Sequence, residues 1–225
     1  EFLRRGARLT EGRERLVRVI VALVPIYVAL TLGLWVLLVA LGEVPLVALC
    51  HAMSVLSTSG ISPVGGLQSA QAGTGGEALM ALVLIFALSR VTFSRDTVTS
   101  DSGGLRQDPE LRIGLAIVVA VPLVLFARHY LGAFEVGQQD SLAQALQALW
   151  GGLFTVLSFL TTTGFVSDHW ASAQAWSGLQ TPGMILMGLA LIGGGVATTA
   201  GGVKLLRVFA LYQNGLREME KLVHP

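Results

Sequence analysis

Long apolar runs separated by short polar segments organise the chain. Three continuous runs cover residues 19–41, 111–134 and 183–211, and a shorter one covers residues 78–89. A helix needs about 20 apolar residues to cross the hydrocarbon core of a bilayer, whereas a spanning strand would alternate polar and apolar residues. The runs therefore predict an all-α membrane protein with four spanning helices, of which the second and fourth are imperfect.

The positively charged residues fall into three groups. Six arginines precede the first run, four lie near the centre, and four Lys or Arg residues are close to the end, while only Arg128 falls elsewhere. Residues 43–76 and 129–182 contain no Lys or Arg. Because cytoplasmic loops of membrane proteins are enriched in Lys and Arg, both ends and the centre are predicted to be cytoplasmic and these two segments external.

Each external segment holds an apolar stretch, at residues 44–56 and 143–160. These stretches are too apolar for solvated loops, and a complete crossing would conflict with the charge pattern. A helix that enters the membrane and returns on the same side satisfies both constraints. Non-helical backbone at that depth is tolerated only where it is packed in protein or lines a water-filled path. We therefore predict two re-entrant helices and, with them, a pore.

The chain also repeats itself. Placing Gly60 over Gly164 aligns residues 57–61 (STSGI) with residues 161–165 (TTTGF). Each copy has the order spanning helix, re-entrant pore helix, polar loop and spanning helix, which is a K⁺-channel-like arrangement. An internal repeat of this kind means that one structural unit is used twice.

The repeat defines the domain organisation. We predict one repeat at residues 1–96, a hydrophilic cytoplasmic linker at residues 97–112, and a second repeat with an interrupted last helix at residues 113–225. Composition agrees with a membrane location, since 53% of the residues are hydrophobic and 13% are charged, against about 25% charged in soluble domains. The mean hydropathy is +0.69.

The two polar loops carry the candidate chemistry. Their carbonyl and hydroxyl oxygens can replace the hydration shell of a cation, and a glycine permits backbone angles that a side chain would forbid. The helix before each loop directs partial negative charge to it. Neutral oxygens favour a monovalent ion, because Ca²⁺ sites typically recruit Asp or Glu. An external turn would explain one such loop, but not two at equivalent places. The candidate filter residues are Ser57, Thr58, Ser59, Gly60, Thr161, Thr162, Thr163 and Gly164.

The fourth predicted span contains a glycine-rich stretch at residues 193–202 (GGGVATTAGG). Each glycine costs up to about 1 kcal/mol relative to alanine in a helix, so we predict a break at membrane depth. Close packing of helices through small residues is one interpretation, and an intramembrane gate is the other. A phosphate-binding loop fits poorly, because Lys204 neither follows the glycines directly nor precedes Ser or Thr. The candidate gate residues are Gly193, Gly194, Gly195, Thr198, Thr199, Gly201, Gly202 and Lys204.

These motifs resemble the membrane subunits of the Trk/Ktr/HKT superfamily of K⁺ transporters, and the TrkH type in particular. The resemblance covers almost the whole chain and rests on residues 161–165, 108–110 (DPE), 193–204 and 222–225 (LVHP). It implies four helix, pore-loop, helix repeats around one pathway, of which this chain would hold the second and third. It also implies K⁺ uptake across a bacterial inner membrane, with K⁺ as the transported ion and no organic cofactor.

The resemblance further implies partners. These are the first and fourth repeats, a second copy in a homodimer, and a cytoplasmic nucleotide-binding regulatory subunit of the TrkA kind. The basic cytoplasmic segments would equally suit anionic lipid headgroups. A net charge of +1 gives no indication of a nucleic-acid partner.

Two other classes of function are open from the residues alone. A substrate-coupled secondary transporter also uses broken helices, although its repeats would be expected to be inverted and these run in the same direction. A membrane enzyme would need an intramembrane cluster of His, Asp, Glu or Cys, and none is found, so no enzymatic activity is predicted. His51 and Ser54 are expected to pack or to form hydrogen bonds rather than to bind a ligand, and the single Cys50 excludes an internal disulfide.

Overall fold

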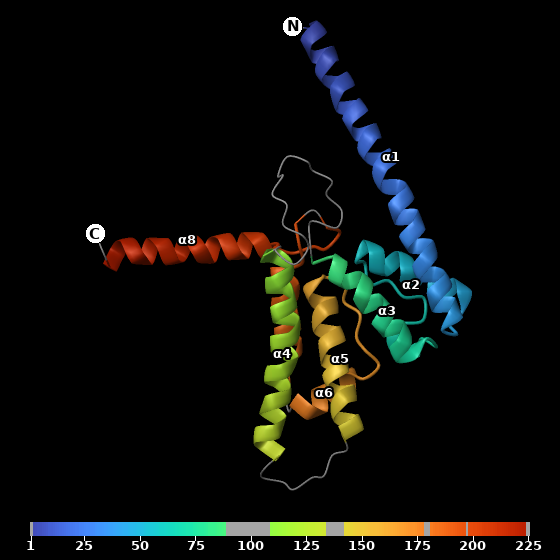
Figure 1. The fold of residues 1–225 in the computed structure, drawn as a ribbon, viewed down its shortest axis with the longest axis vertical. Coiled ribbons are helices and arrows are strands. Elements are labelled where there is room, and N and C mark those ends of the chain that lie inside the picture. The colour runs from blue at the N-terminus through green and yellow to red at the C-terminus, as the bar shows by residue number, and fades with distance from the viewer. Residues whose placement is uncertain (1, 89–108, 134–141, 178–180, 197, 224–225) are drawn as a thin grey trace.

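A computed structural model describes residues 2–88, 109–133, 142–177, 181–196 and 198–223 (Figure 1). Within these residues the chain is all-helical and contains no strand, as predicted. The helices are α1 (Phe2–Ala40), α2 (Pro45–Ser57), the 3₁₀ turn η1 (Leu67–Ser69), α3 (Gly73–Phe86), α4 (Pro109–Ala133), α5 (Leu142–Leu160), α6 (Trp170–Ser177), α7 (Gly183–Ile192) and α8 (Leu205–Val223).

Among the described residues, three helices are long and apolar enough to cross a membrane: α1, α4 and α5. The sequence predicts α5 as re-entrant, yet its 19 residues span about 28 Å, close to the thickness of a bilayer core. By contrast, α3 has 14 residues and α7 has 10. Length alone therefore does not separate spanning from re-entrant helices here, and the path of the chain after each helix decides the matter.

Several predicted segments fall partly outside the described residues. Of the predicted linker, residues 97–108 are outside, and residues 109–112 form the beginning of α4. Residue 108 of the DPE motif at residues 108–110 is also outside, as are residues 224–225 of the LVHP motif at residues 222–225. Figure 1 shows α8 and the N-terminal part of α1 extending away from the remaining helices.

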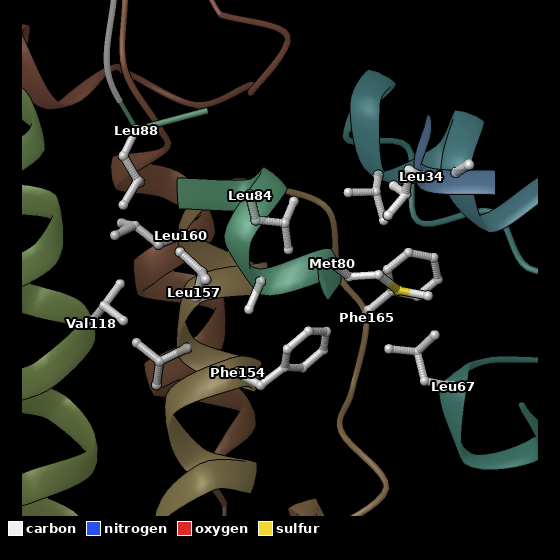
Figure 2. Packing of buried hydrophobic residues seen from close by; sticks show 14 of the residues in the cluster. Leu34, Leu67, Met80, Leu84, Leu88, Val118, Phe154, Leu157, Leu160 and Phe165 are labelled. Atoms are coloured by element: carbon white, nitrogen blue, oxygen red, sulfur yellow. The ribbon is translucent and has the colours of Figure 1, made fainter. Parts of the chain in front are cut away.

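The core joins the two repeats. Met80 and Leu84 of α3 in the first repeat belong to the same buried cluster as Phe154 and Leu157 of α5 in the second repeat (Figure 2). All four are at most 1% exposed. Fully burying side chains of this size contributes about 1.5–3 kcal/mol each, so the repeats pack as one unit and hold their polar loops in a fixed relation.

Candidate functional site

Both candidate filter loops begin with the same backbone turn. Thr58 and Thr162, which are equivalent in the repeat, have φ values of 49° and 59°, and Gly60 and Gly164 have φ values of 66° and 84°. A β-branched residue in this left-handed region is an outlier that costs about 1–2 kcal/mol. Strain of this kind is typical of functional positions, where the surrounding structure holds it in place.

Hydrogen bonds close each turn in the same way. The Ser59 N–H donates to the carbonyl of Ser54 over 3.0 Å, and the Thr163 N–H donates to the carbonyl of Ser158 over 2.8 Å. Together with the bonds from Thr58 to Val55 and from Thr162 to Phe159, they form the motif in which a left-handed residue ends a helix. The repeat seen in the sequence is therefore a repeat of backbone geometry.

The loop side chains also follow one pattern. The hydroxyls of Ser57 and Thr161 donate to the carbonyls of Met53 and Leu157, and each lies 3.1 Å from a hydroxyl two residues further on. The backbone carbonyls are placed differently. Within the described residues, no hydrogen bond is donated to the carbonyl oxygens of residues 58–60 and 162–164. These oxygens are the groups that the loops leave available to a cation.

The two loops meet in space. A Cβ atom added to Gly60 would overlap the carbonyl oxygen of Thr163, so only glycine fits where the first loop touches the second. Phe165, which follows the second loop, packs edge to face on His51 of α2, with ring centroids 5.7 Å apart. By contrast, a Cβ atom added to Gly164 would have no heavy atom of the described chain within 4 Å.

After each glycine the chain turns back along the helix that preceded it. Beyond Gly164, the Ser167 N–H donates to Thr155 Oγ1 over 3.2 Å, and a Cβ atom on Gly151 would lie 2.6 Å from the carbonyl oxygen of His169. In the first repeat, Ser62 Oγ lies 2.8 Å from His51 Nε2. The partners move backward along the helix as the chain moves forward, which is the course expected of a re-entrant segment.

The predicted break in the last span is present. Helix α7 ends at Ile192 and α8 begins at Leu205, and the described residues between them contact the second loop and the end of α2. The Gly201 N–H donates to Thr162 Oγ1 over 2.6 Å, and the Thr199 hydroxyl donates to the carbonyl of Leu56 over 3.1 Å. Because this stretch is not helical, close packing of two regular helices does not explain its glycines.

The other candidate gate residues shape this segment from within. Gly193 and Gly202 have φ values of 73° and 78°, and each leaves room for the backbone of the other. The Thr198 hydroxyl donates to the carbonyl of Gly195 over 2.7 Å. The Lys204 ammonium group donates to the carbonyl of Ala200. Gly194 lies against the backbone of Ala87 and Thr161.

Sequence reasoning missed three buried carboxylates: Glu43, Glu77 and Glu110, which are 4%, 3% and 1% exposed. Glu110 Oε1 accepts a hydrogen bond from the Val196 N–H in the interrupted span, over 3.1 Å. Glu43 and Glu77 bind backbone N–H groups that follow the two loops. For Glu43 and Glu77 the available signal was a lone acid next to an apolar helix in a region without Lys or Arg, whereas Glu110 lies between Arg106 and Arg112 and had been used only as part of the DPE motif. His51 and Ser54 are hydrogen-bonding residues, as predicted.

Comparison with known proteins identifies relatives along nearly the whole chain. No protein-family model matches the chain. The Trk system potassium uptake protein TrkH of Vibrio parahaemolyticus is 29% identical over 225 residues, which cover 96% of this chain and 43% of that protein. The Trk system potassium uptake protein TrkH of Salmonella typhimurium is 37% identical over 123 residues, covering 53% of this chain and 22% of that protein.

The fold has a solved counterpart. The crystal structure of the potassium transporter TrkH from Vibrio parahaemolyticus is similar with a TM-score of 0.75 and 24% identity, over 94% of this chain and 43% of that chain. The present chain therefore spans less than half the length of these relatives. On the sequence similarity, the chain is homologous to the TrkH potassium uptake proteins and corresponds to a part of their length.

Proposed function

We propose that this chain forms part of a K⁺ uptake transporter of the bacterial inner membrane, in which its two loops supply part of a selectivity filter. The observation that carries the proposal is the contact of Gly60 with the carbonyl of Thr163. It brings two loops of the same geometry together at the ends of two helices. Homology to proteins named for potassium uptake supports the choice of ion.

The loops would act by replacing water around the ion. The carbonyl oxygens of residues 58–60 and 162–164, which accept no hydrogen bond within the described residues, would take the place of the hydration shell. The C-terminal ends of α2 and α5 add partial negative charge at the same place. Residues 43–77 and 129–182 contain five Asp or Glu and no Lys or Arg, so the external face would attract cations and repel anions.

The chain would supply two sides of a four-part pathway. The first loop already has a neighbour at Gly60, whereas the space beside Gly164 is open in the described residues. We assign that space to the loop of a following repeat, since the homologous proteins are more than twice as long. The homodimer and the nucleotide-binding regulatory subunit, both expected from the resemblance, belong to the same proposal. So does the cytoplasmic position of both ends, which is expected from the distribution of Lys and Arg.

The interrupted segment at residues 193–204 would act as a gate on the cytoplasmic side of the filter. It is bonded to the end of α2 through Thr199 and to the second loop through Gly201. A non-helical segment held by a few hydrogen bonds can be displaced at modest cost, because each bond contributes about 0.5–1.5 kcal/mol. Closing and opening would then consist of making and breaking these contacts.

Reconstitution of the complete transporter in liposomes tests the function. Uptake is driven by a membrane potential that is negative inside the vesicles, with K⁺ or Na⁺ outside. Uptake of K⁺ that exceeds uptake of Na⁺ is expected. Absence of K⁺ uptake, or equal uptake of the two ions, would overturn the proposal. Empty vesicles serve as the control for leakage.

A further inference from the structure

Glu77 belongs to the first repeat, yet its carboxylate is buried against the second. It lies on α3 and is 3% exposed. Its Oε2 accepts hydrogen bonds from Trp150 Nε1 over 2.9 Å and from the Ser167 hydroxyl over 2.8 Å, and its Oε1 accepts one from the Asp168 N–H over 2.7 Å. All three donors are in the second repeat, so one side chain ties the two repeats together.

Two of these donors follow the second candidate filter loop directly. Ser167 is three residues beyond Gly164, and its N–H is bonded to Thr155 of α5 on the other side. Ser167 Oγ also accepts a hydrogen bond from the His169 N–H over 3.1 Å. Three residues of extended chain reach about 10 Å at most, so a displacement of Ser167 is passed on to Gly164 with little slack.

The carboxylate is satisfied by these donors rather than by a cation. The sequence contains no Lys or Arg at residues 43–89 or 129–203, and Glu77 forms no ion pair with another described residue. Burying a charge is costly unless it is hydrogen-bonded, and bonds to a charged acceptor are the stronger kind. The hydrogen bonds of Glu77 therefore fix the position of residues 165–168, the return segment that follows Gly164.

We propose that Glu77 is a positioning residue for ion selection: it holds the return segment of the second filter loop from the neighbouring repeat. The inference rests on the proposed function, since it assigns to one repeat the control of the filter geometry in the next. Glu77 acts on the ion through Ser167 and Asp168 and does not itself contact the ion.

Glu43 provides a matched comparison. It is buried to the same extent, at 4% exposed, and accepts hydrogen bonds from the backbone of Val44, Gln71 and Ala72. These donors belong to its own repeat, and Gln71 lies eleven residues beyond Gly60 rather than three. Glu43→Gln thus removes the same charge from the same external half without releasing the segment next to a filter glycine.

The experiment compares Glu77→Gln, Ser167→Ala, the double variant and Glu43→Gln in the complete transporter in liposomes. KM and maximal rate are measured for K⁺ and for Na⁺, with Gly164→Ser as the reference for a damaged filter. A glutamine amide cannot accept on its nitrogen, so at least one donor loses its partner. We expect Glu77→Gln and Ser167→Ala to lower K⁺ selectivity over Na⁺ by about threefold to tenfold. The double variant should be no worse than the stronger single variant, and Glu43→Gln should keep wild-type selectivity.

The outcomes separate the inference from the proposed function. Folded Glu77→Gln protein with a lower maximal rate but an unchanged ion ratio would overturn the positioning role, as would equal effects of Glu77→Gln and Glu43→Gln. If Glu77→Gln fails to fold, the selectivity of Ser167→Ala tests the positioning role instead, because this variant leaves the carboxylate in place. An unchanged ion ratio in Ser167→Ala would then overturn the role. Unchanged selectivity in Gly164→Ser would count against the filter itself, whereas a loss in Gly164→Ser alone would reject only the role of Glu77.

Discussion

Replacing Gly60 by alanine tests the contact between the two loops. Gly60 has a φ of 66°, and a Cβ atom there would overlap the backbone carbonyl of Thr163. Gly65 offers a matched control close by in the chain. Its φ is 82°, and a Cβ atom there would have no heavy atom of the described chain within 4 Å. The two substitutions therefore share the backbone strain and differ in the overlap.

The structure sets the size of the difference. Placing a side chain in the left-handed region costs about 1–2 kcal/mol, and forcing an extra carbon atom into packed surroundings costs about 1–3 kcal/mol more. Gly65→Ala should then lower the free energy of unfolding by about 1–2 kcal/mol, and Gly60→Ala by about 2–5 kcal/mol. The overlap cannot be relieved by a side-chain rotation, because the opposing atom is backbone, so the second loop itself must move.

Denaturant titration of the purified complete transporter in detergent micelles, followed by tryptophan fluorescence, measures the difference in stability. The same preparations, reconstituted in liposomes, report the ratio of K⁺ to Na⁺ uptake, which should fall for Gly60→Ala and stay unchanged for Gly65→Ala. Equal destabilisation by the two substitutions, together with unchanged selectivity in Gly60→Ala, would refute the claim that the loops touch at this point.

Two further predictions concern the interrupted span. Thr199→Val removes the hydrogen bond to the Leu56 carbonyl while keeping the shape of the side chain; loss of one bond of about 0.5–1.5 kcal/mol should raise K⁺ uptake by about twofold to tenfold in liposomes. Unchanged or lower uptake by folded protein would contradict the contact's role in closure. Deleting residues 194–201 removes the contacts to the second loop and to the end of α2 and should raise uptake further. A well-folded deletion variant whose uptake is no higher than wild type would show that the segment is not a barrier.

Local sequence patterns predicted much of the fold. The apolar stretches at residues 44–56 and 143–160 coincide with α2 and α5 within one residue at each end, because a buried helix is a continuous local feature. The break at residues 193–202 was equally readable, since a run of glycines is unfavourable in any helix. The two loops share their geometry because they share their sequence pattern.

Element boundaries were harder where glycine or tertiary packing decides. The predicted span at residues 78–89 is a helix that starts earlier, at Gly73. Its first turn contains three glycines, which are unfavourable in helices, so the sequence did not predict this start. Helix α6, at residues 170–177, was not predicted. It is a short helix that packs against α5, and a helix of that length depends on such packing rather than on its own propensity.

Contacts between distant segments could not be predicted. The bonds of Glu77 join residues 73 to 91 positions apart, and the bond from Thr199 to Leu56 joins residues 143 positions apart. Periodicity and composition describe faces and lengths of helices, and they do not say which faces meet. The loops were therefore readable as candidate filter elements, whereas the residues that hold them in place were not.

The central claim is that the loop ending at Gly164 selects K⁺. The most direct measurement is the ratio of K⁺ to Na⁺ uptake by the complete transporter in liposomes, for wild type, Gly164→Ser and the control Gly188→Ser. Gly188 lies in α7, where a Cβ atom meets no heavy atom of the described chain within 4 Å. A lower ratio in Gly164→Ser with a wild-type ratio in Gly188→Ser is predicted. An unchanged ratio in folded Gly164→Ser protein would contradict the account.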